Sequence, residues 1–174
     1  DRPVNLQDGD ASAARAARGK ILIDREIELP AGAVRVAPLE DTVDGTIVFP
    51  PSQWDGRPVD RLTLRFERGR VIEIAAGSGR AAVAAELASV PEEARAFREF
   101  ALGFSRLLAV PDRTPWIPYY GYGAGVVRLS LGDNSELGGD IGGGYVRWNF
   151  FTDATVTVGN EVWVREGRLV PPAP

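Results

Sequence analysis

The stretch from Leu62 to Ile74 constrains the fold of this chain more than any other part of the sequence. Leu62, Leu64 and Phe66 alternate with polar residues, the turn Glu67-Arg-Gly-Arg70 follows, and an apolar segment resumes at Val71. Alternation with a period of two places the apolar side chains on one face of a strand. The segment therefore predicts a β-hairpin with one buried face.

The rest of the chain reads mostly as strands. Its 20 glycines and 13 prolines suit a fold rich in strands and loops, and the apolar fraction of 44% supplies a core. Short helices are expected at residues 10–19, 77–90 and 91–98. Further strands are expected at 21–29, 33–36, 46–49, 100–104, 125–131, 145–151, 154–158 and 161–164, with a hairpin turn at Gly159-Asn160. We predict one mixed α+β domain over residues 1–174, largely antiparallel and strand-rich, with two or three short helices.

Three missing residue types limit the chemistry. The sequence has no His, no Cys and no Met. Without His and Cys, zinc loses its two commonest protein ligands, and a Ser or Thr nucleophile loses its usual base. A Ser-Lys pair would have to use Lys20, the only lysine. Disulfides are excluded, so the redox compartment cannot be read from the sequence.

The charge balance argues against two classes of partner. The formal net charge is −4, which gives no overall attraction to nucleic acid or to an anionic membrane. No apolar run approaches the length of a membrane span, and no signal peptide is recognisable. We expect a cytoplasmic protein that binds neither nucleic acid nor membrane.

Several polar and aromatic residues have both a functional and a structural interpretation. Glu40-Asp41 could ligate a hard cation or act as a base, although a solvated turn is the favoured alternative. Glu99 precedes a buried strand and either acts in a site or closes a helix surface. The glycines of 138–144 lack the Gly-Lys-Ser/Thr of a phosphate loop, which favours a mobile or a tight loop. The aromatic residues could line a pocket or pack beneath a loop: Trp116, Tyr119, Tyr120 and Tyr122.

Three ordered stretches carry a resemblance. They are Leu29-Pro-Ala-Gly-Ala-Val-Arg-Val-Ala-Pro-Leu-Glu-Asp-Thr-Val-Asp-Gly-Thr-Ile-Val-Phe49, Arg98-Glu-Phe-Ala-Leu-Gly103, and Gly125-Val-Val-Arg-Leu-Ser-Leu-Gly-Asp-Asn134 followed by Gly138-Gly139 and Tyr145-Val-Arg-Trp-Asn149. Together they resemble the C-terminal half of the aminopeptidase T (AmpS-like, thermophilic-type) metalloaminopeptidase family. The resemblance begins near residue 29 and implies that family's C-terminal fold, with no counterpart of its N-terminal domain.

The resemblance also implies a site. The family holds two divalent metals with two Glu, two His, an Asp and often a Tyr. Carried over by position, the Glu ligands fall on Glu40 and Glu99. The His positions fall on Arg128 and Arg147, the Asp position on Asn149, and the Tyr position near Ser135. We therefore expect no metal and no other cofactor, with the two arginines neutralising the two buried carboxylates.

Two functional hypotheses follow. The first is a degenerate, metal-free member of the family that acts as a binding or assembly module. Its expected ligand is an anionic small molecule or a peptide carboxylate, and its expected partner is a second copy or a paralogous subunit. Its expected binding residues are Arg128, Arg147, Asn149, Glu40, Glu99 and Tyr122. The alternative is a hydrolase that works through carboxylates alone, by itself or completed by another chain, with Glu40 and Glu99 as the catalytic candidates.

Overall fold

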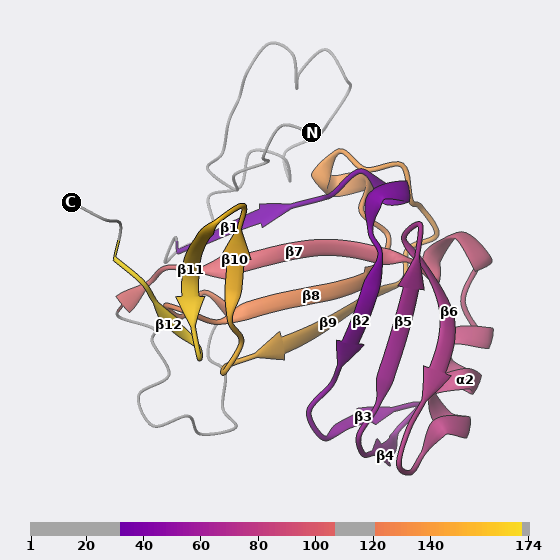
Figure 1. Ribbon diagram of the computed structural model, residues 1–174. Coiled ribbons are helices and arrows are strands. Elements are labelled where there is room, and N and C mark those ends of the chain that lie inside the picture. The colour runs from indigo at the N-terminus through magenta and orange to yellow at the C-terminus, as the bar shows by residue number, and fades with distance from the viewer. Residues whose placement is uncertain (1–31, 107–120, 172–174) are drawn as a thin grey trace. The chain divides into compact units, whose positions relative to one another are not determined.

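The computed structural model describes residues 32–106 and 121–171 (Figure 1). The predicted helix at 10–19, the predicted strand at 21–29, Lys20, and the aromatic residues Trp116, Tyr119 and Tyr120 lie outside these residues.

The described residues form twelve strands, one α-helix and three 3-10 turns. The strands are β1 (Ala33–Val36), β2 (Gly45–Val48), β3 (Ser52–Trp54), β4 (Arg57–Val59), β5 (Thr63–Glu67), β6 (Arg70–Ala75), β7 (Phe97–Gly103), β8 (Val127–Gly132), β9 (Val146–Phe151), β10 (Val156–Val158), β11 (Glu161–Arg165) and β12 (Arg168–Leu169). The helix is α2 (Arg80–Ala88), and the turns are η2 (Glu40–Thr42), η3 (Glu92–Ala94) and η6 (Ser135–Leu137). The predicted class, a strand-rich and largely antiparallel α+β fold, is confirmed.

The strands make four sheets, with the orders β1-β7-β8-β9, β10-β11-β12, β2-β5-β6 and β3-β4. The pairs β1/β7, β2/β5, β5/β6, β3/β4, β10/β11 and β11/β12 are all antiparallel. The described chain also divides into two compact units, one of residues 37–99 and 129–149, the other of the remaining described residues.

The hairpin predicted from alternation forms the centre of the first unit. Leu64 pairs with Ile74 across β5 and β6, while Leu62, Leu64 and Phe66 are all buried. Phe66 meets Phe97 edge to face, with 6.0 Å between the ring centroids. The buried residues of α2, which confirms the helix predicted at 77–90, belong to the same core: Ala82, Val83 and Leu87.

The helix predicted at 91–98 is wrong beyond its first turn. Only Glu92–Ala94 is helical, and β7 begins at Phe97. Tertiary contacts outweigh the local signal, because the Phe97 N–H donates to the Gly69 carbonyl and the Ala96 carbonyl accepts from Gly132. Backbone groups that bond to distant parts of the chain in this way cannot also form the N–H(i) to C=O(i−4) hydrogen bonds of an α-helix.

A second hairpin, β3-β4, was not predicted. Its turn is Asp55-Gly56, with φ of 46° and 68°. Both angles are positive, as a two-residue type I′ turn requires, and Asp-Gly is one of the preferred sequences for that turn. The hairpin matters because it carries Trp54, which has no solvent exposure.

The second unit contains the predicted short strands. Ala33 to Val36 of β1 pair with Gly103 to Phe100 of β7. The predicted turn at Gly159 joins β10 to β11, with φ of 58° at the glycine. These elements confirm the predicted strands at 33–36, 154–158 and 161–164.

Candidate functional site

Glu99 is a fully buried carboxylate with a cation beside it. It lies in β7, and the Ser130 hydroxyl of β8 donates to its Oε1 at 3.1 Å. The guanidinium of Arg98 forms an ion pair with Glu99 and a second one with Glu136. Arg98 is only 1% exposed, and its Nε donates to the Asp133 carbonyl at 2.5 Å. The negative charge of Glu99 is therefore compensated inside the protein by an arginine of the same strand.

Glu40, in η2, accepts hydrogen bonds from the protein. Its Oε1 accepts from the Asn134 side-chain amide and from the Asp140 N–H, each at 3.0 Å. Asn134 is fully buried, and its Oδ1 accepts from the Ile141 N–H at 2.9 Å. One asparagine thus joins Glu40 to the glycine-rich loop, and of the two predicted alternatives, mobile or tight, the loop packs tightly around Asn134.

Asp133 organises the other end of that loop. Its Oδ1 accepts from the Ser135 hydroxyl at 2.6 Å and from the Ser135 N–H at 2.9 Å. Its Oδ2 accepts from the Gly144 N–H at 2.9 Å. Partial burial acts to raise the pKa of Asp133, but these three hydrogen bonds, helped by the charge of Arg98, hold the pKa below its usual value of 3.8.

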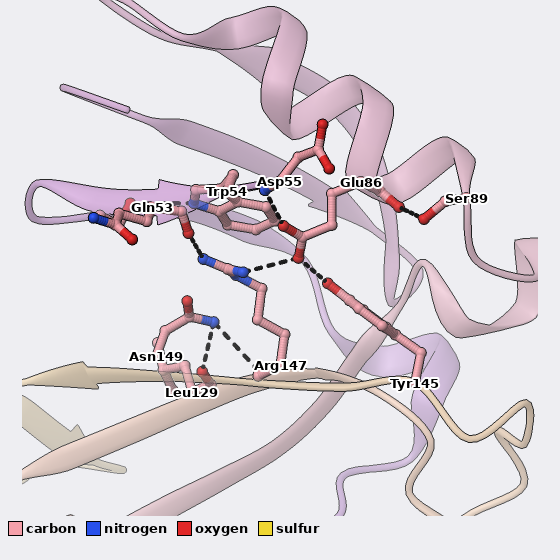
Figure 2. Close-up of polar contacts among 10 residues, drawn as sticks. Gln53, Trp54, Asp55, Glu86, Ser89, Leu129, Tyr145, Arg147 and Asn149 are labelled. Atoms are coloured by element: carbon pink, nitrogen blue, oxygen red, sulfur yellow. Dashed lines mark hydrogen bonds and ion pairs between the residues drawn. The ribbon is translucent and has the colours of Figure 1, made fainter. Parts of the chain in front are cut away.

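Arg147 binds a carboxylate that the sequence analysis did not identify. Its Nη1 donates to Glu86 Oε1 of α2 at 2.8 Å, and its Nη2 donates to the Gln53 carbonyl at 2.5 Å (Figure 2). Its Cζ lies 3.5 Å from the centroid of a Trp54 ring. The expectation that Arg147 neutralises Glu40 or Glu99 is therefore wrong, because its guanidinium is committed to Glu86 and Trp54. The local sequence gives no signal for Glu86, since it stands in an alanine-rich helix.

Tyr145 completes this group, which we call the Glu86 cluster: Trp54, Glu86, Tyr145 and Arg147. The Tyr145 hydroxyl donates to Glu86 Oε1 at 2.8 Å, and the Asp55 N–H donates to Glu86 Oε2 at 2.7 Å (Figure 2). Burial raises the pKa of Tyr145 well above its usual value of 10, and the hydrogen bond and charge of Glu86 add to that effect against the opposing Arg147. Both oxygens of Glu86 are thus bound by protein donors.

The remaining expected site residues are buried. The Asn149 side chain donates to the Leu129 carbonyl at 3.2 Å and to the Arg147 carbonyl at 3.4 Å. Arg128 and Tyr122 are 2% and 4% exposed, and both belong to the second unit. Neutralisation of Glu40 or Glu99 by Arg128 stays a prediction, as do the ligand-binding roles of Arg128, Asn149 and Tyr122.

The described carboxylates do not fit the pair of metals that the resemblance implies. Within residues 32–106 and 121–171, no three His, Cys, Asp or Glu residues are grouped so that they could hold a metal ion. Oε1 of Glu99 accepts a hydrogen bond from Ser130 while its other oxygen faces Arg98, and Oε1 of Glu40 accepts hydrogen bonds from two N–H groups.

Within the described part of the chain, no helix is long and apolar enough to cross a membrane.

Comparison with known proteins finds one matching family and solved structures of similar fold, two of which follow. Residues 4–108 match the family described as thermophilic metalloprotease (M29). The structure of 2,5-dihydroxypyridine dioxygenase from Pseudomonas putida KT2440 matches 80% of this chain and 44% of its own, with a TM-score of 0.66 and 18% identity. Wild-type AmpT from Thermus thermophilus matches 82% of this chain and 40% of its own, with a TM-score of 0.52 and 22% identity.

At these identities the two structures establish likeness of fold alone, and the chain spans less than half the length of either. No curated protein sequence matches the chain.

Proposed function

This chain belongs to the thermophilic metalloprotease family (M29), and from that premise we propose that it is a metal-free member which binds a ligand or partner without hydrolysing it. The observation that carries the proposal is the Arg98–Glu99 pair. Both side chains are almost completely buried, and Glu99 is the second carboxylate that the family resemblance assigns to the metals.

The physical argument concerns competition for Glu99. A metal at Glu99 would have to displace the Arg98 guanidinium, which also holds the Asp133 carbonyl and Glu136. Breaking a buried ion pair on one side costs about 3–5 kcal/mol, because the other charge stays buried without compensation. With neither His nor Cys anywhere in the sequence, a metal would gain only oxygen ligands in return.

The binding or assembly role that we propose uses a carboxylate ligand. Arginine is suited to planar recognition of a carboxylate, and an anionic small molecule or a peptide carboxylate is the class of ligand we propose. We also propose that the partner is a second copy of the chain or a paralogous subunit. Val146 and Trp148, both about two-fifths exposed on the terminal strand β9, support an interface there.

The deciding experiment is elemental metal analysis of the purified chain, followed by thermal denaturation with Zn²⁺, Mn²⁺ and Mg²⁺. We expect no stoichiometric metal and no rise in melting temperature. Stoichiometric metal or a dose-dependent rise would overturn the proposal, since a ligand that binds only the folded state must stabilise it.

A parallel assay of amino-acid release from peptides tests the hydrolase alternative. Release that is lost in Glu40→Gln but kept in Glu93→Gln, an exposed glutamate of η3, would establish carboxylate-only hydrolysis instead.

A further inference from the structure

A groove of about 350 Å³ lies between β6 and α2 in the first unit. Its apolar lining includes Val71 and Ile74 from β6, and Ala84 and Leu87 from α2. β6 is the last strand of the order β2-β5-β6, and α2 runs beside it (Figure 1). Ile72 of this edge strand is 43% exposed. The groove is therefore an open channel beside β6 that is lined by both apolar and charged side chains, and its volume lies within the range of ligand sites.

Two arginines of the groove lining have no acidic partner among the described residues. Arg80, the exposed first residue of α2, donates through Nε to the Ile74 carbonyl at 2.9 Å and forms no ion pair with any described carboxylate. Arg95 donates through Nη2 to the Val90 carbonyl at 3.1 Å, and its buried Nε has no hydrogen-bond partner in the described part of the chain. These guanidiniums give the groove a positive charge in a chain whose net charge is −4.

The acidic residue of the lining does not cancel that charge. Glu73 forms an ion pair with Arg65, with 3.2 Å between Arg65 Nε and Glu73 Oε2. Arg65 lies on the neighbouring strand β5 and does not line the groove. The groove thus combines apolar side chains with two guanidiniums that no described carboxylate neutralises, and Arg80 is the more exposed of the two.

We propose that this groove binds the C-terminal end of an extended partner polypeptide. The inference rests on the proposed function, because it names the partner class of a module that binds without cleaving. The last residues of the partner lie extended along the groove, its apolar side chains contact Val71, Ile74 and Leu87, and its terminal carboxylate binds Arg80.

Two features favour a peptide over a small anion. From Val71 to Ile74 the strand covers roughly 10 Å at about 3.3 Å per residue, the length of three or four extended residues. A small anion would bind Arg80 but leave the apolar lining exposed to water.

The probe is a pool of fluorescein-labelled hexapeptides whose last four positions are randomised over Val, Ile, Leu and Phe. One pool ends in a free carboxylate and the other in an amide, and binding is followed by fluorescence anisotropy. We expect the amide pool to bind about tenfold more weakly than the carboxylate pool, which corresponds to one lost charge-assisted interaction.

The variants locate the carboxylate. Arg80→Gln should bind the carboxylate pool about as weakly as the wild-type chain binds the amide pool, with no further loss on amidation. The matched control is Arg165→Gln, an exposed arginine of β11 in the second unit, which should behave as wild type. Ala88→Tyr, placed on an exposed lining residue, should block both pools.

Equal binding of the two pools, absence of binding to the wild-type chain, or unchanged binding by both groove variants would overturn the inference. Mass spectrometry of the peptides separates this outcome from failure of the proposed function. Peptides that lose residues refute a module that binds without cleaving, whatever the anisotropy shows. Intact peptides that bind elsewhere refute only the groove.

Discussion

The guanidinium of Arg147 lies over the ring of the fully buried Trp54, with 3.5 Å from Cζ to the ring centroid, while it pairs with Glu86 at 2.8 Å. One side chain of β9 thereby holds both the β3-β4 hairpin and α2. The combination of a stacked cation and an ion pair uses the planarity of the guanidinium as well as its charge.

Replacing Arg147 by Lys should show what planarity contributes. Lysine keeps the charge but cannot stack on Trp54 while it donates to Glu86 and Gln53, so we expect a loss of about 1–2 kcal/mol in the free energy of unfolding. Arg147→Ala should lose about 2–4 kcal/mol, because Glu86 is left partly buried without its cation. Urea denaturation measures both. If Lys and Ala cost the same, stacking contributes nothing.

Tyr145 should ionise later than a free tyrosine. Its raised pKa means that the folded state keeps the phenolic proton more strongly than the unfolded state does. The resulting stability is fully present below pH 10 and is lost as the pH rises through the higher folded pKa. Absorbance at 295 nm, followed as the pH rises, should show a tyrosine that ionises well above pH 10, and Tyr145→Phe should remove that part of the curve. If the ionisation that this substitution removes has its midpoint near pH 10, the account is contradicted.

Asn134→Asp should be more damaging than Asn134→Ala. The aspartate would place a second carboxylate beside Glu40 Oε1, to which the amide now donates at 3.0 Å. Two adjacent carboxylates cannot both ionise without cost, so the pair should take up a proton with a raised pKa. We expect about 3 kcal/mol or more lost at pH 7 for the aspartate, recovered in part toward pH 5, and a loss for the alanine that changes little with pH. Urea denaturation at the two pH values checks this.

Two glycines of the same loop should respond differently to alanine. A Cβ on Gly139 would overlap the side-chain amide of Asn134, whereas a Cβ on Gly142 would have nothing within 4 Å. Gly139→Ala must therefore displace the residue that holds Glu40, and we expect a loss of about 2 kcal/mol or more. Gly142→Ala should lie within about 0.5 kcal/mol of wild type. Comparable melting temperatures for the two variants would refute the tight loop.

Asp133 should contribute to stability only while it is ionised. Its folded pKa lies below the usual 3.8, so the contribution is present above pH 4 and disappears as the pH falls through the folded value. The difference in unfolding free energy between the wild-type chain and Asp133→Asn should accordingly shrink between pH 5 and pH 3. A difference that stays constant over that range would show that ionisation of Asp133 plays no part.

The sequence predicted local features better than distant contacts. Alternation at Leu62, Leu64 and Phe66 located the central hairpin, because strand periodicity depends only on near neighbours in sequence. The helix expected at 91–98 failed where backbone bonds to Gly69 and Gly132 decide the structure. The Glu86 partner of Arg147 lies 61 residues away and could not be found from either local sequence.

The burial of Arg98 also orders the folding of the chain. Its carbonyl and carboxylate partners, Asp133 and Glu136, lie 35 and 38 residues further along. Glu99 alone leaves the other N–H groups of the Arg98 guanidinium without acceptors, and burying polar groups without partners is costly. We therefore expect the part of β7 around Arg98 to stay exposed to water during synthesis until residues 133–136 have been made.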